Sequence, residues 1–226
     1  MSEWWSYRPS DFLMFSPRIY WRLFASLNLM AWPAQPLIVG AALAWLWRHG
    51  RQAETLGPAA ARLALGGMAM AWLAVAWLFF QQRYAPINWA AGYATATFLL
   101  QAAGLLALAW LGGVQGRSDA VRRHFGLALL VWALLAHPLL AWAGGRPWLQ
   151  AEVFGLAPDP TAIGTLGLLL LLRAQCPAAH VALLALWPLP WLWCLISAAT
   201  LWTMGSPQAA VLAAAAALSL VALVRR

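Results

Sequence analysis

The sequence contains no lysine, few acids and only two cysteines. Its 14 Lys+Arg residues are all arginine, against 6 Asp+Glu in 226 residues. Without lysine, the chain can form neither a retinal-type Schiff base nor a lysine nucleophile. Cys176 and Cys194 form no CxxC pair, which argues against a disulfide framework.

Catalytic signatures are also missing. The chain has no GxSxG, no HExxH and no phosphate-binding glycine loop, so no catalytic residue, metal or cofactor is expected. Cys176 and His180 lie four residues apart, but two ligands are too few for a metal site. His137 lies within an apolar segment, which makes it a functional candidate. No second histidine is expected at a matching depth for a haem, so we expect His137 to be a hydrogen-bonded structural residue.

Apolar residues are plentiful, at 64% of the chain against 9% charged. Uncharged stretches of about 20 residues are long enough to cross a bilayer as helices. The sequence therefore predicts an all-α integral membrane protein, a bundle of about seven transmembrane helices, because helices satisfy their own backbone in lipid. The predicted spans are residues 24–47 (kinked by Pro33 and Pro36), 61–80, 87–111, 125–143, 160–173, 179–203 and 207–224.

Two segments depart from regular spans. Residues 1–23, rich in aromatics and arginine, predict an extracytoplasmic or interfacial segment before the transmembrane domain of residues 24–226. Residues 160–173 are short for a span, so either that helix continues further or the loop before it dips into the bundle. Asp159, directly before a proline, is expected to cap this helix.

The net charge of +8 comes from arginines scattered between apolar segments, so no nucleic-acid partner is expected. On the predicted topology, nine arginines lie on the C-terminal side (48, 51, 62, 117, 122, 123, 173, 225 and 226) and five on the N-terminal side (8, 18, 22, 83 and 146). Arginine-rich loops stay in the cytoplasm. This count predicts a cytoplasmic C-terminus and an N-terminus outside.

Polar side chains gather in short patches that this topology places at the extracytoplasmic end. The patches are residues 4–12, 81–93 and 144–160. Their convergence predicts a ligand site formed mainly by the last two. The candidate residues are Arg83, Tyr84, Asn88, Trp89, Tyr93, Arg146, Trp148, Glu152 and Asp159.

The candidates also have structural interpretations. Arg83 and Arg146 either bind an anionic group or pair with a loop acid such as Glu152 or Asp159. The two acids either form an acid/base pair, or Asp159 serves as a helix cap. The tryptophans near this end form either an interfacial belt or the wall of a cavity.

Several motifs resemble one known family. They are WWSYRPSDFLMFSPRIYWRLF, NLMAWPAQ, RYAPINWAAGY, RPWLQAEVFGLAPDPTAIGTLGLLLL and WCLISAATLW, which cover nearly the whole chain. The resemblance is to a family of small bacterial multi-pass inner-membrane proteins catalogued only as a domain of unknown function, some of which are labelled permeases. It implies a bacterial inner-membrane location, and it carries over no activity and no functional residue.

Three functions remain open. The first is a non-enzymatic accessory or assembly subunit of a larger membrane complex, which suits the short loops and interfacial aromatics. The second is a small-molecule transporter or channel with a site where residues 81–93 and 146–160 meet, because broken helices form substrate sites in transporters. The third is a membrane-embedded enzyme with an outward-facing site on Glu152, Asp159, Arg83, Arg146 and Tyr84. The expected partners are membrane lipids and, for the first hypothesis, other membrane proteins.

Overall fold

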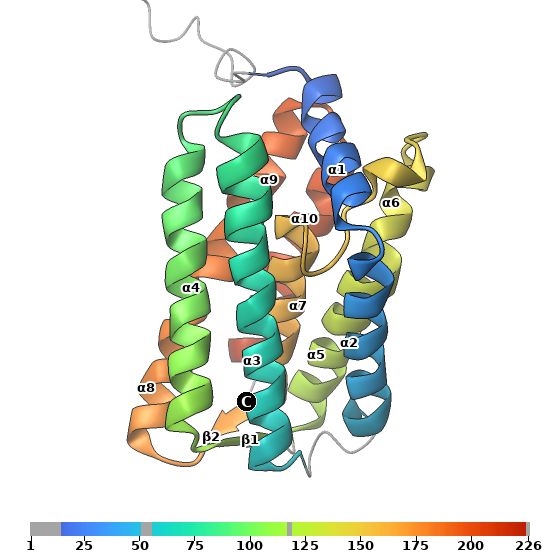
Figure 1. Ribbon diagram of the computed structural model, residues 1–226. Coiled ribbons are helices and arrows are strands. Elements are labelled where there is room, and N and C mark those ends of the chain that lie inside the picture. The colour runs from blue at the N-terminus through green and yellow to red at the C-terminus, as the bar shows by residue number, and fades with distance from the viewer. Residues whose placement is uncertain (1–14, 51–55, 117–118, 225–226) are drawn as a thin grey trace, which may run out of the picture.

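Helices form most of the structure. The computed structural model describes residues 15–50, 56–116 and 119–224, and its helices pack as a bundle (Figure 1). The predicted all-α class is confirmed. The elements are α1 Pro17–Ala31, α2 Ala34–Gly50, α3 Pro58–Ala74, η4 Val75–Tyr84, α4 Ala91–Leu111, β1 Val114–Gly116, α5 Ala120–Val131, η5 Trp132–Ala136, α6 His137–Ala143, η6 Trp148–Gln150, α7 Pro158–Leu171, β2 Leu172–Ala174, α8 Pro177–Ala185, α9 Pro188–Thr203 and α10 Gln208–Val224.

Several helices have the length and composition of membrane spans. In the described part of the chain there are four: Pro58–Tyr84, Ala91–Leu111, Ala120–Ala143 and Pro177–Thr203. The pair α1 and α2 would make a fifth if it is one span. Helices α10 and α7 are shorter, at 17 and 14 residues. Each predicted span thus coincides with a helical segment, although not every one has the length of a full crossing.

The first predicted span is a sharp corner instead of a kinked helix. Helices α1 and α2 are bent by 85° at the break between them, where the Trp32–Pro33 peptide bond is cis. Helix α1 begins at Pro17, after a cap from the Ser16 side chain. A proline in the first helical position is typical of a helix start, and residue 23, the end of the predicted N-terminal segment, lies within this helix. Residues 1–14 lie outside the described part of the chain.

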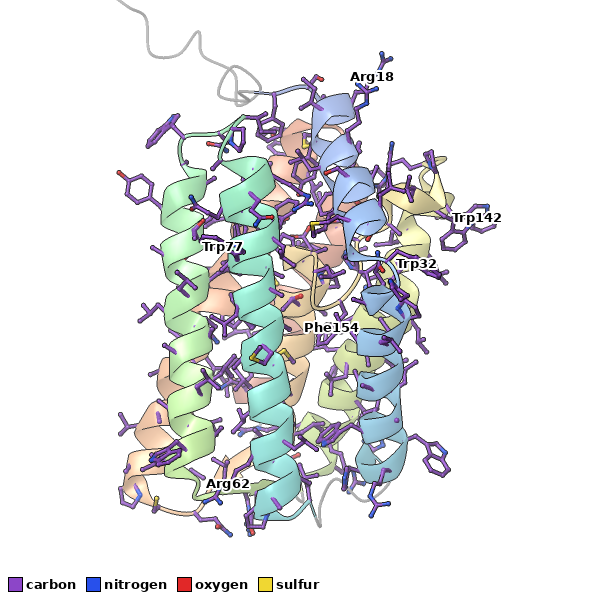
Figure 2. The ribbon with its side chains drawn as sticks, viewed as in Figure 1. Arg18, Trp32, Arg62, Trp77, Trp142 and Phe154 are labelled. Carbon is purple, nitrogen blue, oxygen red and sulfur yellow. The ribbon has the colours of Figure 1, made fainter. Side chains whose placement is uncertain are left out.

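The outer surface of the bundle is strongly apolar. Large hydrophobic side chains are exposed on most of the long helices, among them Trp47, Leu63, Trp110 and Trp202. Figure 2 shows such side chains pointing away from the bundle, with Arg18 and Arg62 at opposite ends. A soluble monomer rarely exposes contiguous apolar surface on this scale. The surface is therefore of the kind that lipid or another membrane helix covers.

Helix α7 occupies the middle of the bundle. All of its 14 residues are buried, and it contacts α3, α5, α9 and α10 (Figure 1). Small residues permit this packing: a Cβ added to Gly167 would lie 2.7 Å from the carbonyl oxygen of Gly126 on α5. Close backbone approach through glycine is typical of helix packing in membranes.

The loop before α7 enters the bundle. This was one of the two explanations for the short predicted span, the other being a helix that continues further. Six of the seven residues 151–157 are buried. The Asn28 side chain on α1 donates to the backbone oxygens of Leu149 and Ala151, both at 2.8 Å. These bonds satisfy irregular backbone that lies among helices, as a low-dielectric interior requires.

The other end of α7 does not extend into a longer helix. Directly after Leu171, strand β2 pairs antiparallel with β1, with Val114 opposite Ala174. This two-stranded sheet connects the segment that follows α7 to the segment that follows α4. The helix is therefore short because both of its ends pass into non-helical structure within the protein.

Candidate functional site

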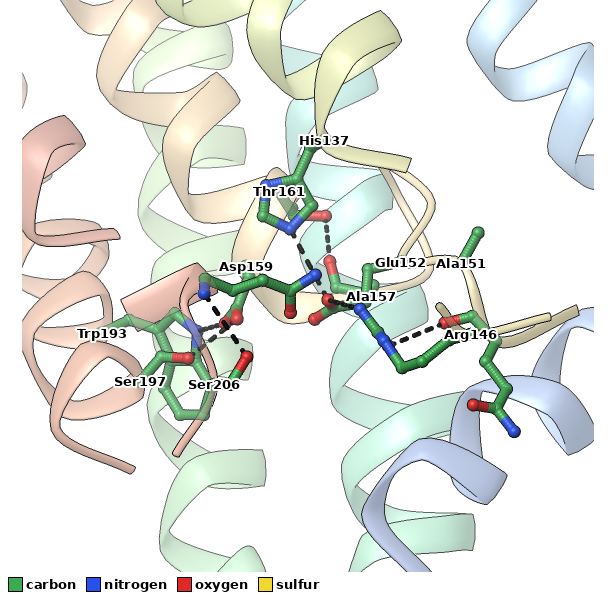
Figure 3. Close-up of polar contacts among 12 residues, drawn as sticks. His137, Arg146, Ala151, Glu152, Ala157, Asp159, Thr161, Trp193, Ser197 and Ser206 are labelled. Atoms are coloured by element: carbon green, nitrogen blue, oxygen red, sulfur yellow. Dashed lines mark hydrogen bonds and ion pairs between the residues drawn. The ribbon is translucent and has the colours of Figure 1, made fainter. Parts of the chain in front are cut away.

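Three ionisable side chains meet near the N-terminal end of α7. His137 begins α6, Glu152 lies on the buried loop, and Asp159 is in the first turn of α7. Each has an exposed fraction of 1% or less. The His137 Nε2 and Glu152 Oε2 atoms are 3.8 Å apart, and one ligand atom from each of the three residues lies within 4.8 Å of the others. Figure 3 shows these side chains converging from separate segments.

Asp159 is held by helix α9. Trp193 Nε1 donates to Asp159 Oδ1 and Ser197 Oγ donates to Oδ2, both at 2.8 Å (Figure 3). The expectation that Asp159 caps its helix is wrong. The N-cap position is Ala157, with Pro158 in the first helical position, so the Asp159 carboxylate is further in and points to α9 instead.

Arg146 covers the outer side of the cluster. Its guanidinium stacks 3.5 Å from the centre of the Trp21 ring, and Nη1 donates to the Gln150 carbonyl oxygen at 3.3 Å. Its Nη2 atom is 3.8 Å from Glu152 Oε2. Of the two interpretations of Arg146, binding an anionic group or pairing with a loop acid, the structure shows it beside the loop acid Glu152.

Burial shifts the pKa values of Glu152 and Arg146. Desolvation raises the pKa of Glu152 well above its usual value, and nearby Asp159 raises it further, while Arg146 acts in the opposite direction. Burial also lowers the pKa of Arg146, and Glu152 offsets part of that change. Burial disfavours the charged form of either group. Desolvation and the neighbouring Asp159 thus both favour the protonated form of Glu152.

His137 is the member of the cluster that sequence reasoning left out. It was expected to be a hydrogen-bonded structural histidine, but neither ring nitrogen has a hydrogen-bond partner within the described residues. The available signal was a lone histidine inside an apolar segment, a pattern typical of functional sites. The sequence could not show that Glu152 is a neighbour of His137, because Glu152 lies on a loop whose path is set by packing.

A cavity of about 340 Å³ lies beside the cluster. Tyr84, Asn88 and Tyr93, all predicted site residues, contribute to its wall, together with Tyr20, Trp193 and Ser197, which were not predicted. The remaining lining residues are Phe79, Phe80, Ala90, Ala94, Thr97, Ile196 and Thr200. Because Trp193 and Ser197 also bond Asp159, two side chains connect the cavity to the buried acid.

Two π-helical segments lead into the site, one at the cavity and one at the buried cluster. The π-helical segment η4 ends at Tyr84, and η5 ends directly before His137. Such i→i+5 turns are uncommon and recur at functional sites. Here each one sets the angular position of a side chain that reaches the cavity or the cluster.

The remaining predicted residues lie elsewhere. Arg83 donates to the Leu78 carbonyl oxygen at 2.6 Å and to Ser26 Oγ at 3.1 Å, so it ties η4 to α1. Trp89 and Trp148 are largely exposed, at 70% and 57%. The structure thus divides the nine candidates: Arg146, Glu152 and Asp159 form the cluster, Tyr84, Asn88 and Tyr93 line the cavity, and Arg83, Trp89 and Trp148 do neither.

A second, apolar crevice touches the buried loop at Phe154 and Gly155. It has a volume of about 530 Å³ and runs between α2 and α3, where Ile38, Trp45, Met70 and Phe154 line it. Figure 2 labels Phe154 of the loop between these two helices. The loop that carries Glu152 is therefore flanked by a second space on its Phe154 side.

These features define an all-α protein whose apolar helices are long enough to cross a membrane and enclose a buried ionisable cluster. The chain belongs to the family of unknown function DUF6064, which matches residues 17–226. This result confirms the predicted resemblance to a family catalogued only as a domain of unknown function. No curated protein and no solved structure matches the chain.

Proposed function

We propose that this protein is a small-molecule transporter of the bacterial inner membrane, with its substrate site at the extracytoplasmic end of the bundle. The cavity beside Asp159 is the observation that carries the proposal. Cavities lined by aromatic side chains with a few polar groups are typical small-molecule sites. The arginine count favours an outer N-terminus and a cytoplasmic C-terminus, and the family resemblance favours a bacterial source.

The buried cluster supports transport over a purely structural role. Ionisable groups at membrane depth are costly and mark solute or ion pathways more often than packing contacts. His137, Glu152 and Asp159 are all almost completely buried. An accessory subunit that only packs against partners has no need of such a cluster.

The short helix α7 and the buried loop before it also favour a transport function. A short helix that starts among other helices directs its N-terminal end, with its partial positive charge, at the space in front of it. Here Asp159 lies in the first turn of α7, and the loop before it is buried. Transporters use such discontinuous helices to build sites that helix ends and side chains share.

A ligand screen on the purified protein tests this proposal. Thermal unfolding in mild detergent is followed by tryptophan fluorescence, with amino acids, sugars, nucleosides and polyamines as probes. Because a ligand that binds the folded state raises Tm, we expect one chemical class to stabilise the protein and to be taken up by proteoliposomes.

Matched variants of α4 locate the binding. Thr97 lines the cavity, whereas its neighbour Ala96 does not, and both are exposed. Thr97→Trp should abolish the ligand-induced shift, while Ala96→Trp should leave it unchanged. A protein that no probe stabilises, and that runs on a native gel only in complex with other membrane proteins, would favour the accessory-subunit function instead.

A further inference from the structure

Several polar atoms of the buried cluster have no hydrogen-bond partner within the described residues, although a protonated Glu152 side chain lies in reach of Asp159. The distance from His137 Nε2 to Glu152 Oε2 is 3.8 Å, and the distance from Arg146 Nη2 to the same oxygen is also 3.8 Å. Both exceed the length of a hydrogen bond. Both His137 nitrogens and Glu152 Oε1 are buried without a hydrogen-bond partner within the described residues. Buried polar atoms without partners need an explanation, and an absent ion is one.

The spacing fits two ligands of one metal ion. With metal–ligand bonds of about 2.0–2.2 Å, neighbouring ligand atoms lie about 3–4 Å apart. The observed 3.8 Å falls in that range, and the ligand atoms of His137, Glu152 and Asp159 all lie within 4.8 Å of one another.

We propose that His137, Glu152 and Asp159 form a binding site for one divalent first-row transition metal ion. One imidazole nitrogen and two carboxylate oxygens are a mixed set that suits Zn²⁺ or Mn²⁺. Mg²⁺ and Ca²⁺ prefer oxygen ligands alone. Three protein ligands leave a coordination position for water or for a solute.

The surroundings resemble those of metal ligands. Ligating carboxylates are commonly oriented by hydrogen bonds from a second layer of residues. Asp159 receives one such bond on each oxygen, from Trp193 and Ser197. An ionised carboxylate has about four lone-pair sites, so these two bonds leave room for a metal ion. Binding of a divalent ion would release the proton from Glu152, and the two carboxylates would then balance the charge of the ion.

Arg146 does not compete for the same position. The Trp21 ring and the Gln150 carbonyl oxygen already stabilise its guanidinium, and its side chain keeps 12% exposure. It therefore lies on the outer side of Glu152, between the cluster and the end of the bundle. A guanidinium is a cation with donors only, so Arg146 contributes no metal ligand.

Metal analysis of the full-length protein tests the site. Protein in mild detergent is stripped with EDTA, incubated with Zn²⁺ or Mn²⁺, desalted and analysed for bound metal per chain, with Mg²⁺ as the comparison ion. We expect one Zn²⁺ or Mn²⁺ per chain, a higher Tm with the ion bound, and no retention of Mg²⁺.

Conservative variants assign the ligands. His137→Gln and Glu152→Gln should lower the metal affinity by about 100-fold. Ser197→Ala, which removes a hydrogen bond to Asp159 and also changes the cavity wall, should lower it by about 10-fold. His124→Gln is the matched control, because His124 is exposed and its ring lies against the Ala120 carbonyl oxygen. This control should bind metal normally.

Two results would overturn the site. The first is a folded wild-type protein that retains neither Zn²⁺ nor Mn²⁺, and this outcome does not depend on any variant. The second is undiminished binding in folded His137→Gln and Glu152→Gln proteins, which would place the metal elsewhere. Neither result bears on the solute screen, so the transport proposal stands or fails separately.

Discussion

Helices α7 and α2 are both apolar, yet they occupy opposite environments. Every residue of α7 is buried, whereas α2 buries only Gln35 among its 17 residues. Helix α2 presents Leu37 and Trp47 outward, with exposed fractions of 68% and 73%. The share of apolar residues in a helix therefore does not distinguish the centre of this bundle from its surface.

The difference lies in what the small and polar residues contact, because α2 also contains a glycine, Gly40, but nothing lies within 4 Å of a Cβ added there. Helix α7 contains Gly164, Gly167, Thr161 and Thr165, which allow close packing and interhelical hydrogen bonds. Helix α2 has bulky side chains such as Trp45 and Trp47, which suit lipid or a loosely packed crevice. In a bilayer the lipid is as apolar as the protein interior, so steric fit and polar bonding determine which helix is central.

The largest effect is expected from Gly167→Leu. An added Cβ would lie 2.7 Å from the Gly126 carbonyl oxygen and 3.0 Å from the Leu130 backbone nitrogen, so the α5 backbone would have to move. We expect a loss of about 3 kcal/mol or more, since overpacking against backbone cannot relax easily. Tryptophan-detected thermal unfolding and the yield of monodisperse protein measure it.

Its counterpart on α2 is Gly40→Leu. No atom lies within 4 Å of a Cβ added there, so Tm should stay unchanged or rise slightly, because leucine favours a helix more than glycine does. Equal destabilisation by both substitutions would show that α2 is packed as tightly as α7 in the membrane.

An intermediate effect is expected from Thr165→Val on α7. Thr165 Oγ1 accepts from Trp72 Nε1 at 2.7 Å and donates to the Thr161 carbonyl oxygen at 2.7 Å. Valine keeps the shape but leaves a buried indole N–H without a partner, at a cost of about 1–3 kcal/mol.

Thr200→Val on α9 is its control, because that hydroxyl is exposed and bonds only within its own helix; a change within about 0.5 kcal/mol is expected. Stability is compared by denaturant titration in the same detergent. Equal losses in the two variants would contradict the importance of the α7 to α3 bond.

The smallest effects are expected on α2. Gln35 Nε2 donates to the Asn28 carbonyl oxygen at 2.6 Å, so Gln35→Met should cost about 1 kcal/mol. Trp47→Leu, at an exposed position, should cost about 0.5 kcal/mol or less. Thermal unfolding of the two variants in the same detergent measures both changes. If Trp47→Leu were the more damaging change, α2 would be packed against a partner on its outer face.

Much of the fold was predictable from local chemistry. Uncharged stretches of about 20 residues identified the helices, because a bilayer span requires that length. The turn between α9 and α10 was also predictable: Gly205 has φ +70°, a conformation that glycine adopts freely, and Pro207 follows before α10. The helix at residues 160–173 was correctly singled out as too short.

One error concerns Asp159. It was expected to cap its helix, because aspartate directly before a proline has a strong local preference for that position. The tertiary structure uses the residue differently, since Trp193 and Ser197 from α9 donate to the Asp159 carboxylate.

The candidate site was only partly visible in the sequence. Arg146, Glu152 and Asp159 stood out because charged residues are rare in this chain. The sequence indicates no link between His137 and these residues, and Tyr20, Trp193 and Ser197 are typical members of aromatic or apolar helices. Their role depends on which helix faces which, and side-chain identity alone does not encode that.

The sequence by itself determined that this chain forms helices with an apolar exterior, because backbone hydrogen bonding and hydrophobic length act residue by residue along the chain. Only the tertiary structure decided that α7 lies in the centre, that residues 151–157 enter the bundle, and that His137, Glu152 and Asp159 meet. Those outcomes depend on close packing at Gly126 and Gly167 and on bonds between distant segments. Such interactions exist only once the whole bundle has assembled.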